Sequence, residues 1–539
     1  MTCLHRPAAA AAVMAAPLAA IGVRTVVGTL TCDACAWTDA LTAHQVRHVT
    51  AQHAGGAAAL ATAAARIGGQ LTALLLGPDD ALADALAGIY DAARTQTPML
   101  VLQLQPSPDT TMAWAEAELL EAAGALVRDL PHLRHAPALL PEAVRAAREH
   151  RRPVVVTVSA PHPANTPADD GADQDADQSL EHLPLDLQAV PVADPAAVED
   201  LAGLLTQARR PLFIAGRGAR ASGAMLETLA DQAAALLATT LAAHGMSEGN
   251  PWHIGIAGVL STPGMADLIA AADAVIGWGC SLNDWTTCHG TLLAPDARVA
   301  QVDIDPAALG AHHRIDLGVA GDVGRTAAAV RRILPPQSGY RSESVRRRIA
   351  EQRSWHDIGY QPMLDGQGRI DPRTLSLLLD TLLPAERTLT VACDSIVGYP
   401  ISYLRVPDAA GFVLAPAPHL ALAGGIGAAL ARADRLAVTT LDARGALTAA
   451  AELETAARLH ARLLIVVYDE QPGIDFEQIA TAHGCAAGVV RYAEDLSLLS
   501  QWLAQPAPGP LLLHAHTHPQ AWWRQHNTPA STTAPWSAA

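Results

Sequence analysis

Short runs of apolar residues recur along the whole chain, and longer alanine- and leucine-rich stretches separate them. Glycine, proline or aspartate bounds most of these runs, a pattern typical of buried parallel strands that alternate with helices. The sequence therefore predicts an α/β protein with three doubly wound parallel-sheet domains. The runs that define the strands are RTVVGTL, TALLLGP, PMLVLQLQ and RPVVVTVSA, then RRPLFIAG, DAVIGWGC and RVAQVDID, then RTLTVACD, RLAVTTLD, ARLLIVVYD and GPLLLHAH.

Polar stretches divide these runs into three groups. One segment, rich in Pro, Asp and Gln and nearly free of large apolar residues, predicts a solvated linker over residues 164–188. An Arg-, Ser- and Gln-rich segment predicts a second linker over 336–370. The predicted domains are residues 1–163, 189–335 and 371–525, followed by a flexible tail over 526–539.

Composition excludes several classes of function. The 539 residues carry a net charge of −17, which argues against nucleic-acid and acidic-membrane partners. No lysine occurs anywhere, so Schiff-base chemistry and a lysine-bearing phosphate loop are excluded. The seven cysteines are scattered, which favours a reducing cytoplasmic location over a disulfide framework. No apolar run reaches the ~18 residues of a membrane span.

Several motifs appear in a fixed order along these three groups. The first group holds AQHAGGAAALATAAARIGG and LLLGPDDALADALAGIYDAARTQTPMLVLQLQ, and the second holds ARRPLFIAGRGARASG. The third holds TTLDARG and then VVYDEQPGIDF. In this order the motifs resemble those of the thiamine-diphosphate (ThDP) enzymes of the acetolactate synthase and benzoylformate decarboxylase type. The resemblance implies pyrimidine-binding, middle and diphosphate-binding domains, and decarboxylation of a 2-oxo acid or carboligation of the product.

The first motif departs from the family at its most important position. Relatives carry His-Glu at this strand-to-helix junction, and the Glu activates the cofactor, whereas this chain has His53 followed by Ala54. A methyl group can neither donate nor accept a proton, although some relatives of the glyoxylate carboligase type also lack the Glu. The resemblance implies that His53 and Gln105 face the reacting atoms and that Gly77 contacts the cofactor. The alternative for His53 is a helix-start histidine satisfied by the backbone.

The third-domain motifs imply the site of a divalent metal. Asp442 ends one strand where relatives have Gly-Asp-Gly, and Ala443 replaces the second glycine. Asp469 or Glu470, at the end of a later strand, would supply the second oxygen ligand to Mg²⁺ beside the diphosphate. The alternative for Asp442 is a helix N-cap. Relatives also have some twenty residues after this strand that cover the site, and this chain has almost none.

Further expectations follow from the resemblance. The glycines Gly216 and Gly218 would permit a flavin (FAD) to bind in the middle domain, or would only close a strand-to-helix turn. The family's site lies between two chains, which implies a homodimer or homotetramer acting on a small 2-oxo acid. Loss of the Glu, of the flanking glycine and of the cover leaves a second hypothesis open. In that hypothesis the chain is a non-catalytic, structural or regulatory partner of an active paralogue, assembling with it as a hetero-oligomer.

Two side-chain groups remain without an assigned role. Cys32 and Cys35 form a C-x-x-C pair, but no second pair with zinc spacing follows. Histidines alternate on the predicted last strand and therefore share one face, where they would bind a metal or form a polar sheet edge. They are His514, His516 and His518.

Overall fold

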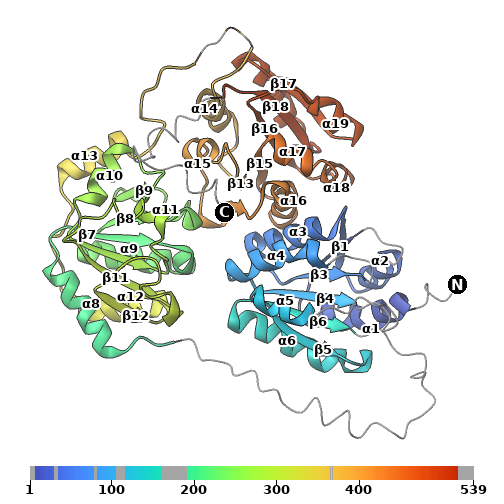
Figure 1. Cartoon of the computed structure of the whole chain (residues 1–539), viewed down its shortest axis with the longest axis horizontal. Helices are drawn as coiled ribbons and strands as arrows, with labels where there is room; N and C mark the ends of the chain where they lie inside the picture. The colour runs from blue at the N-terminus through green and yellow to red at the C-terminus, as the bar shows by residue number, and fades with distance from the viewer. Residues whose placement is uncertain are drawn as a thin grey trace, which may run out of the picture.

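The computed structural model contains three α/β units, each built on one six-stranded sheet (Figure 1). It describes residues 6–29, 34–77, 82–104, 116–158, 191–363, 366 and 368–519. Every strand pair within the three sheets is parallel, and helices cover both faces of each sheet, so the predicted fold class is confirmed. Among the described residues, no helix has both the length and the apolarity needed to cross a membrane.

The first sheet has the strand order β2-β1-β3-β4-β6-β5. Its strands are β1 (Thr25–Thr29), β2 (Arg47–Ala51), β3 (Thr72–Leu76), β4 (Met99–Leu104), β5 (Leu126–Leu130) and β6 (Pro153–Val158). Its helices are α1 (Arg6–Ala20), α2 (Ala34–Ala43), α3 (Ala54–Gly68), α4 (Leu82–Arg94), α5 (Glu116–Ala122) and α6 (Ala136–His150).

The second sheet has the order β12-β11-β10-β7-β8-β9. Its strands are β7 (Pro211–Ala215), β8 (Leu236–Thr239), β9 (His253–Ile256), β10 (Ala274–Trp278), β11 (Arg298–Asp303) and β12 (Leu317–Ala320). The helices around it are α8 (Pro195–Gln207), α9 (Gly223–Ala233), α10 (Pro263–Ala270), α11 (Asp284–Thr287), α12 (Val323–Ile333) and α13 (Glu343–Gln352).

The third sheet has the order β14-β13-β15-β16-β18-β17. Its strands are β13 (Arg387–Ala392), β14 (Phe412–Ala415), β15 (Leu436–Asp442), β16 (Leu463–Asp469), β17 (Ala486–Val490) and β18 (Leu511–His516). Its helices are α14 (Pro372–Leu382), α15 (Gly398–Tyr403), α16 (Ala421–Ala431), α17 (Ala443–Thr448), α18 (Glu452–Arg458), α19 (Phe476–Ala482) and α20 (Ser497–Leu503).

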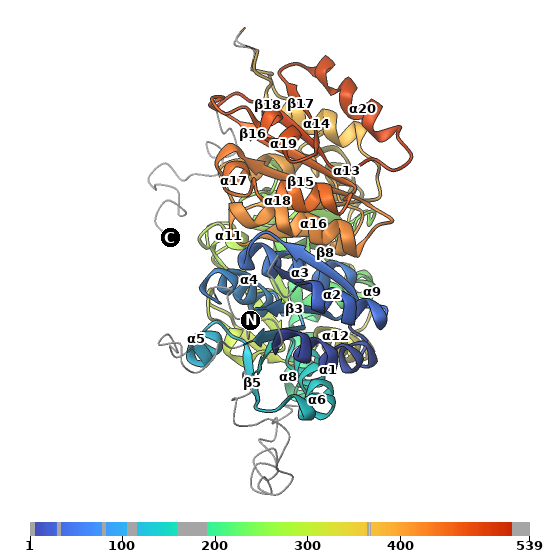
Figure 2. The same ribbon diagram turned by 90° about the vertical axis from the view of Figure 1, so that its right-hand side faces the viewer.

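Helices α3 and α16 join the first and third units, and they lie side by side in both views (Figures 1 and 2). Small residues dominate both helices, so their backbones can approach closely. A Cβ built on Gly427 of α16 would lie 2.3 Å from the carbonyl oxygen of Leu60 on α3. Apolar residues from both units consequently form one shared core cluster around this helix pair, and each unit has a further cluster of its own.

Candidate functional site

Asp442 is the last residue of β15 and the N-cap of α17. Its Oδ1 accepts a hydrogen bond from the Gly445 N–H at 2.7 Å, and its Oδ2 accepts one from the Ser395 hydroxyl at 3.3 Å. The capping role that the sequence left as an alternative is therefore present. Asp442 and the following Ala443 are both partly exposed at the carboxyl edge of the sheet, where parallel α/β folds bind ligands.

Asp394 follows the neighbouring strand β13 and lies against Asp442. Its Oδ2 accepts a hydrogen bond from the Asp442 N–H at 2.7 Å, and its Oδ1 accepts one from Ile396 N–H at 3.0 Å. Burial and the adjacent Asp442 carboxylate raise the pKa of Asp394 to about 8. Two carboxyl groups thus meet at this edge, and sequence reasoning identified only Asp442. The missed signal is a second strand that ends in Asp, in VACD.

Asp469 ends the next strand, but the structure does not bring its carboxylate to Asp442. Asp442 pairs in register with Tyr468, so Asp469 points to the opposite face of the sheet. There its Oδ2 lies 2.9 Å from Nε2 of His514, and both side chains are almost fully buried. Burial acts to raise the pKa of Asp469, but the hydrogen bonds from His514 and Gln471 hold it below the usual value. Glu470 directly follows β16 and is partly exposed.

Of the alternating histidines, His514 belongs to this buried pair, and the partly exposed His516 lies beside it. The rings of His514 and His516 are 4.6 Å apart, consistent with a shared face, and Phe476 packs on the ring of His514. Within the described parts of the chain, no group of three or more His, Cys, Asp or Glu side chains is arranged to hold a metal ion.

His53 caps the N-terminus of α3, on the side of the first unit that packs against α16 and α18. Its Nδ1 accepts a hydrogen bond from the Gly56 N–H at 3.1 Å and lies 3.0 Å from Oδ2 of Asp84. Its Nε2 lies 3.6 Å from Oε1 of Glu452, the first residue of α18. Ala54 is only 4% exposed and belongs to the core shared by α3 and α16.

Glu452 is the functional candidate that the sequence did not indicate. Its side chain is fully buried, and its Oε1 accepts a hydrogen bond from the Gln52 N–H at 3.1 Å. Its Oε2 has no hydrogen-bond partner of good geometry in the part of the chain that the structure describes. Burial raises the pKa of Glu452, although the Thr455 hydroxyl, the Gln52 N–H and the nearby His53 and Arg458 act in the opposite direction.

The remaining predicted residues lie outside this geometry or outside the described parts of the chain. Gly77 directly follows β3, and Gln105 lies outside the described residues. Cys32 also lies outside them, while Cys35 is an exposed free thiol. A Cβ on Gly216 or Gly218 would lie 2.3 Å or 2.9 Å from backbone atoms of Gly279, so loop packing accounts for both glycines.

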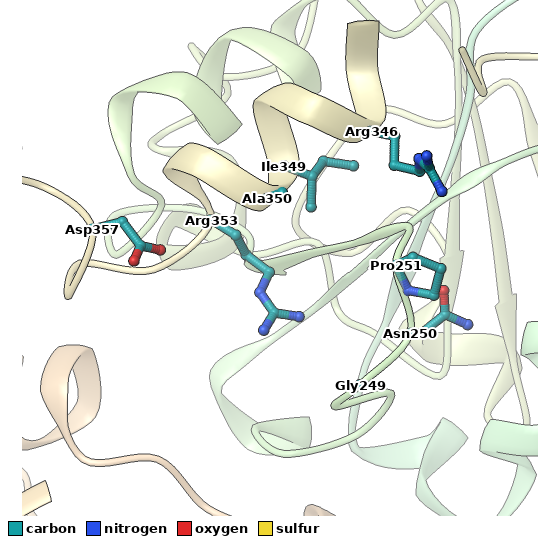
Figure 3. Close-up of a pocket in the computed structure, with 8 residues that line it drawn as sticks. All are labelled: Gly249, Asn250, Pro251, Arg346, Ile349, Ala350, Arg353 and Asp357. Atoms are coloured by element: carbon teal, nitrogen blue, oxygen red, sulfur yellow. The ribbon is translucent and has the colours of Figure 1, made fainter. Parts of the chain in front are cut away.

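A pocket of about 270 Å³ lies elsewhere, between α13 and the loop that precedes β9 (Figure 3). Arg346 and Arg353 project from α13 beside this pocket. Arg346 pairs with Glu343 at 3.0 Å, and Arg353 lies 3.7 Å from Glu248. Both arginines therefore have carboxylate partners, and none of the residues predicted from the sequence motifs lines the pocket.

The donor groups at the carboxyl edge fit a divalent cation carried by a diphosphate. Mg²⁺ in proteins is commonly held by one or two carboxylates together with phosphate oxygens and water. Asp442 and Asp394 supply two adjacent carboxyl groups whose mutual repulsion a cation would relieve. The unpartnered buried oxygen of Glu452 supplies a protonatable group near the start of α3.

Comparison with solved structures defines the fold. The chain superimposes on the ThDP-dependent 4-hydroxybenzoylformate decarboxylase of Rhodococcus jostii RHA1 with a TM-score of 0.73, at 17% identity, over 94% of this chain and 99% of that one. Benzoylformate decarboxylase from Polynucleobacter necessarius gives a TM-score of 0.74 at 16% identity, over 95% and 99% of the two chains. These likenesses show a shared three-domain fold.

Sequence comparison gives the family. Residues 8–122 match the profile of the thiamine pyrophosphate enzyme N-terminal TPP binding domain, and residues 198–330 match that of the central domain. The chain belongs to the thiamine-diphosphate-dependent enzyme family. It is 26% identical to a probable 2-ketoarginine decarboxylase of Pseudomonas aeruginosa over 85% of this chain and 84% of that protein. It is 26% identical to a probable acetolactate synthase large subunit of Methanocaldococcus jannaschii, and this match covers 53% of the chain and about half (49%) of that protein.

Proposed function

We propose that the protein is a ThDP- and Mg²⁺-dependent enzyme that decarboxylates a small 2-oxo acid, or transfers the resulting acyl carbanion equivalent to a second carbonyl. The observation that carries this proposal is the carboxyl pair of Asp442 and Asp394 at the carboxyl edges of two adjoining parallel strands. Relatives described as decarboxylases and as acetolactate synthases support the same class of reaction.

The residues of this chain would act at two places, the start of α17 and the start of α3. Asp442, with Asp394 beside it, would hold the metal and through it the diphosphate at the start of α17. When bound, the cofactor would supply the nucleophilic carbon and the electron sink that decarboxylation of a 2-oxo acid requires. His53, whose side chain is 35% exposed, would orient the reacting groups from the start of α3.

Within one chain, little of the structure would shield the site from solvent, which supports an oligomer. Only residues 470–475 join β16 to α19, so this connection is too short to fold over a bound substrate. Charged intermediates are protected when water is excluded. We therefore infer that a second subunit, either another copy or a paralogous large-subunit partner, completes the enclosure.

A second function is favoured by a different observation. Ala54 offers no acid to a cofactor, and Asp469 is engaged with His514 rather than with Asp442. A chain that has lost these contacts would serve as a structural or regulatory subunit of an active paralogue.

Calorimetric titration with ThDP and Mg²⁺ separates the two functions. Asp442→Asn keeps a side chain that caps a helix equally well but removes the charge that holds the metal. We expect the wild-type protein to bind, and the variant to lose about tenfold or more in affinity. Asp322→Asn, the same change at the N-cap of α12, is the matched control and should bind normally. Absence of binding by the wild-type protein would contradict the enzymatic function. Pyruvate turnover that Asp442→Asn abolishes would contradict the structural one.

A further inference from the structure

Three side chains from three helices form a carboxyl–imidazole–carboxyl array at the N-terminus of α3. His53 is its centre, with Nδ1 at 3.0 Å from Oδ2 of Asp84 and Nε2 at 3.6 Å from Oε1 of Glu452. Asp84 comes from α4, and Glu452 comes from α18 of the third domain. The array therefore spans the junction between the first and third domains.

Asp84 fixes the orientation of the imidazole. Its Oδ2 also accepts a hydrogen bond from the Gly55 N–H at 2.9 Å, so the carboxylate is anchored to the first turn of α3. Nδ1 of His53 lies between Asp84 and the Gly56 N–H, and both of its neighbours are fixed by the backbone. Because Nδ1 accepts a hydrogen bond from the Gly56 N–H, the proton of the neutral ring is on Nε2, which faces Glu452.

Glu452 is held in place, but the hydrogen-bonding capacity of its carboxyl group is not fully used. A Cβ on Gly56 would lie 2.1 Å from Oε1 of Glu452, so the carboxyl group occupies the space that a side chain at this position would fill. The Gln52 N–H donates a hydrogen bond to Oε1, whereas no described residue donates one of good geometry to Oε2, although the Thr455 hydroxyl on the same helix lowers the pKa of this carboxyl group. A buried carboxyl group with an unsatisfied oxygen is stabilised in its protonated form, because ionisation without a partner costs several kcal/mol.

Besides His53, Thr455 and Arg458 of α18 itself act on the Glu452 carboxyl group, and both lower its pKa. Arg458, one and a half turns along α18, donates to Glu454 at 3.0 Å and to the Thr50 carbonyl oxygen at 2.6 Å. Its guanidinium is therefore taken up by other groups. From α3 and its preceding strand, only the Gln52 N–H and His53 face the carboxyl group, and from α4 only Asp84 approaches the array.

We propose that the Asp84–His53–Glu452 array holds the catalytic proton that relatives keep on a glutamate at position 54. This proposal rests on the proposed function. Glu452 is a positioning residue that acts through His53, and His53 is the catalytic residue because its partly exposed ring can meet the cofactor. With the cofactor bound, His53 would supply a proton to its aminopyrimidine ring, and the carboxyl proton of Glu452 would replace the proton lost from His53. The reverse transfer restores the array, so no other reactant is consumed.

The first test uses the protein without cofactor. With ¹³C-labelled glutamate carboxyl groups, nuclear magnetic resonance should show the Glu452 carboxyl titrating above the ordinary range, as a signal separate from that of Glu248, whose pKa burial also raises. This signal should be absent from Glu452→Gln and present in Glu454→Gln, a neighbouring change on the same helix. In His53→Asn, which preserves the helix cap, the signal should titrate at still higher pH because a favourable charge is removed. A wild-type spectrum without such a signal would overturn the proposal.

The second test follows the cofactor. The rate of hydrogen–deuterium exchange at C2 of bound ThDP should fall roughly 10²-fold or more in Glu452→Gln and in His53→Asn, the usual effect of losing a general acid. ThDP affinity should remain within about twofold of the wild type in both variants, and Glu454→Gln should exchange normally. Equal exchange rates in Glu452→Gln and the wild type would refute the array while leaving the proposed function intact. Failure of the wild type to bind ThDP would refute both, and the titration would then identify the array as a structural contact only.

Discussion

The contact between α3 and α16 can be tested by adding a single methyl group at Gly427. In an isolated helix, replacing Gly by Ala is stabilising by about 1 kcal/mol, because Ala loses less conformational freedom. At Gly427 the added Cβ would lie 2.3 Å from the Leu60 carbonyl oxygen, 3.1 Å from its carbon and 3.2 Å from Cβ of Ala63. The first two neighbours are backbone atoms of α3, which cannot rotate away.

The size of the effect follows from how far the helices must separate. A carbon–oxygen contact needs roughly 3.3 Å or more, so α16 has to withdraw from α3 by about 1 Å. Overpacking of this kind typically costs 1–3 kcal/mol, which exceeds the propensity gain. We therefore expect Gly427→Ala to reduce the free energy of unfolding by about 1–2 kcal/mol. The corresponding decrease in melting temperature is about 2–8 °C, depending on the size of the cooperative unit.

Scanning calorimetry provides the measurement, and the chain provides a matched control. Gly203 lies inside α8, and a Cβ built there meets no atom within 4 Å. Gly203→Ala should therefore stabilise the middle domain by about 0.5–1 kcal/mol. If Gly427→Ala is as stable as Gly203→Ala, or more stable than the wild type, the close packing of the two helices is refuted.

Two further predictions concern buried charges. Asp380 is fully buried, with its Oδ2 at 2.7 Å from Nε of Arg405 and its Oδ1 bonded to Arg387. Asp380→Ala leaves the buried Arg387 without this carboxylate and should lower the free energy of unfolding by about 3–5 kcal/mol, measured by thermal unfolding. A decrease of less than about 1 kcal/mol would contradict this reasoning. Burial lowers the pKa of His253 to about 3, so its neutral form is favoured in the folded state. The stability it supports is complete above about pH 6.5 and is lost as the pH falls toward 3. His253→Phe should flatten this part of the stability profile, and an unchanged profile would show that His253 is not responsible.

The fold could be predicted from the sequence because its signals are local. Apolar runs such as ARLLIVVYD and RLAVTTLD are buried strands in the structure, and their alternation with helices fixes the parallel topology. Part of the site could also be predicted from local sequence signals. Asp442 was found because it ends a strand, and Asp394 could have been found by the same rule.

The remaining site residues could not be predicted because their contacts depend on tertiary packing. The hydrogen bond between the Gln52 N–H and Glu452 joins positions 400 residues apart, and nothing in the sequence around Glu452 marks it as buried. The pairing of Asp469 with His514 depends on the neighbouring strands β16 and β18. Because of this pairing, Asp469 does not lie beside Asp442, where its position at a strand end had predicted a second metal ligand.

The origin of Glu452 in the third domain gives a last testable consequence. A glutamate at position 54 would belong to α3 itself, whereas Glu452 meets His53 only while α3 and α16 remain packed. Withdrawal of α16 by about 1 Å in Gly427→Ala should lengthen the His53–Glu452 contact and admit water to the carboxyl group. The late-titrating glutamate signal should then move toward the ordinary range in a variant whose array residues are all intact. If the signal stays where it is while the protein is destabilised, the array is held by α18 alone and does not depend on the helix contact.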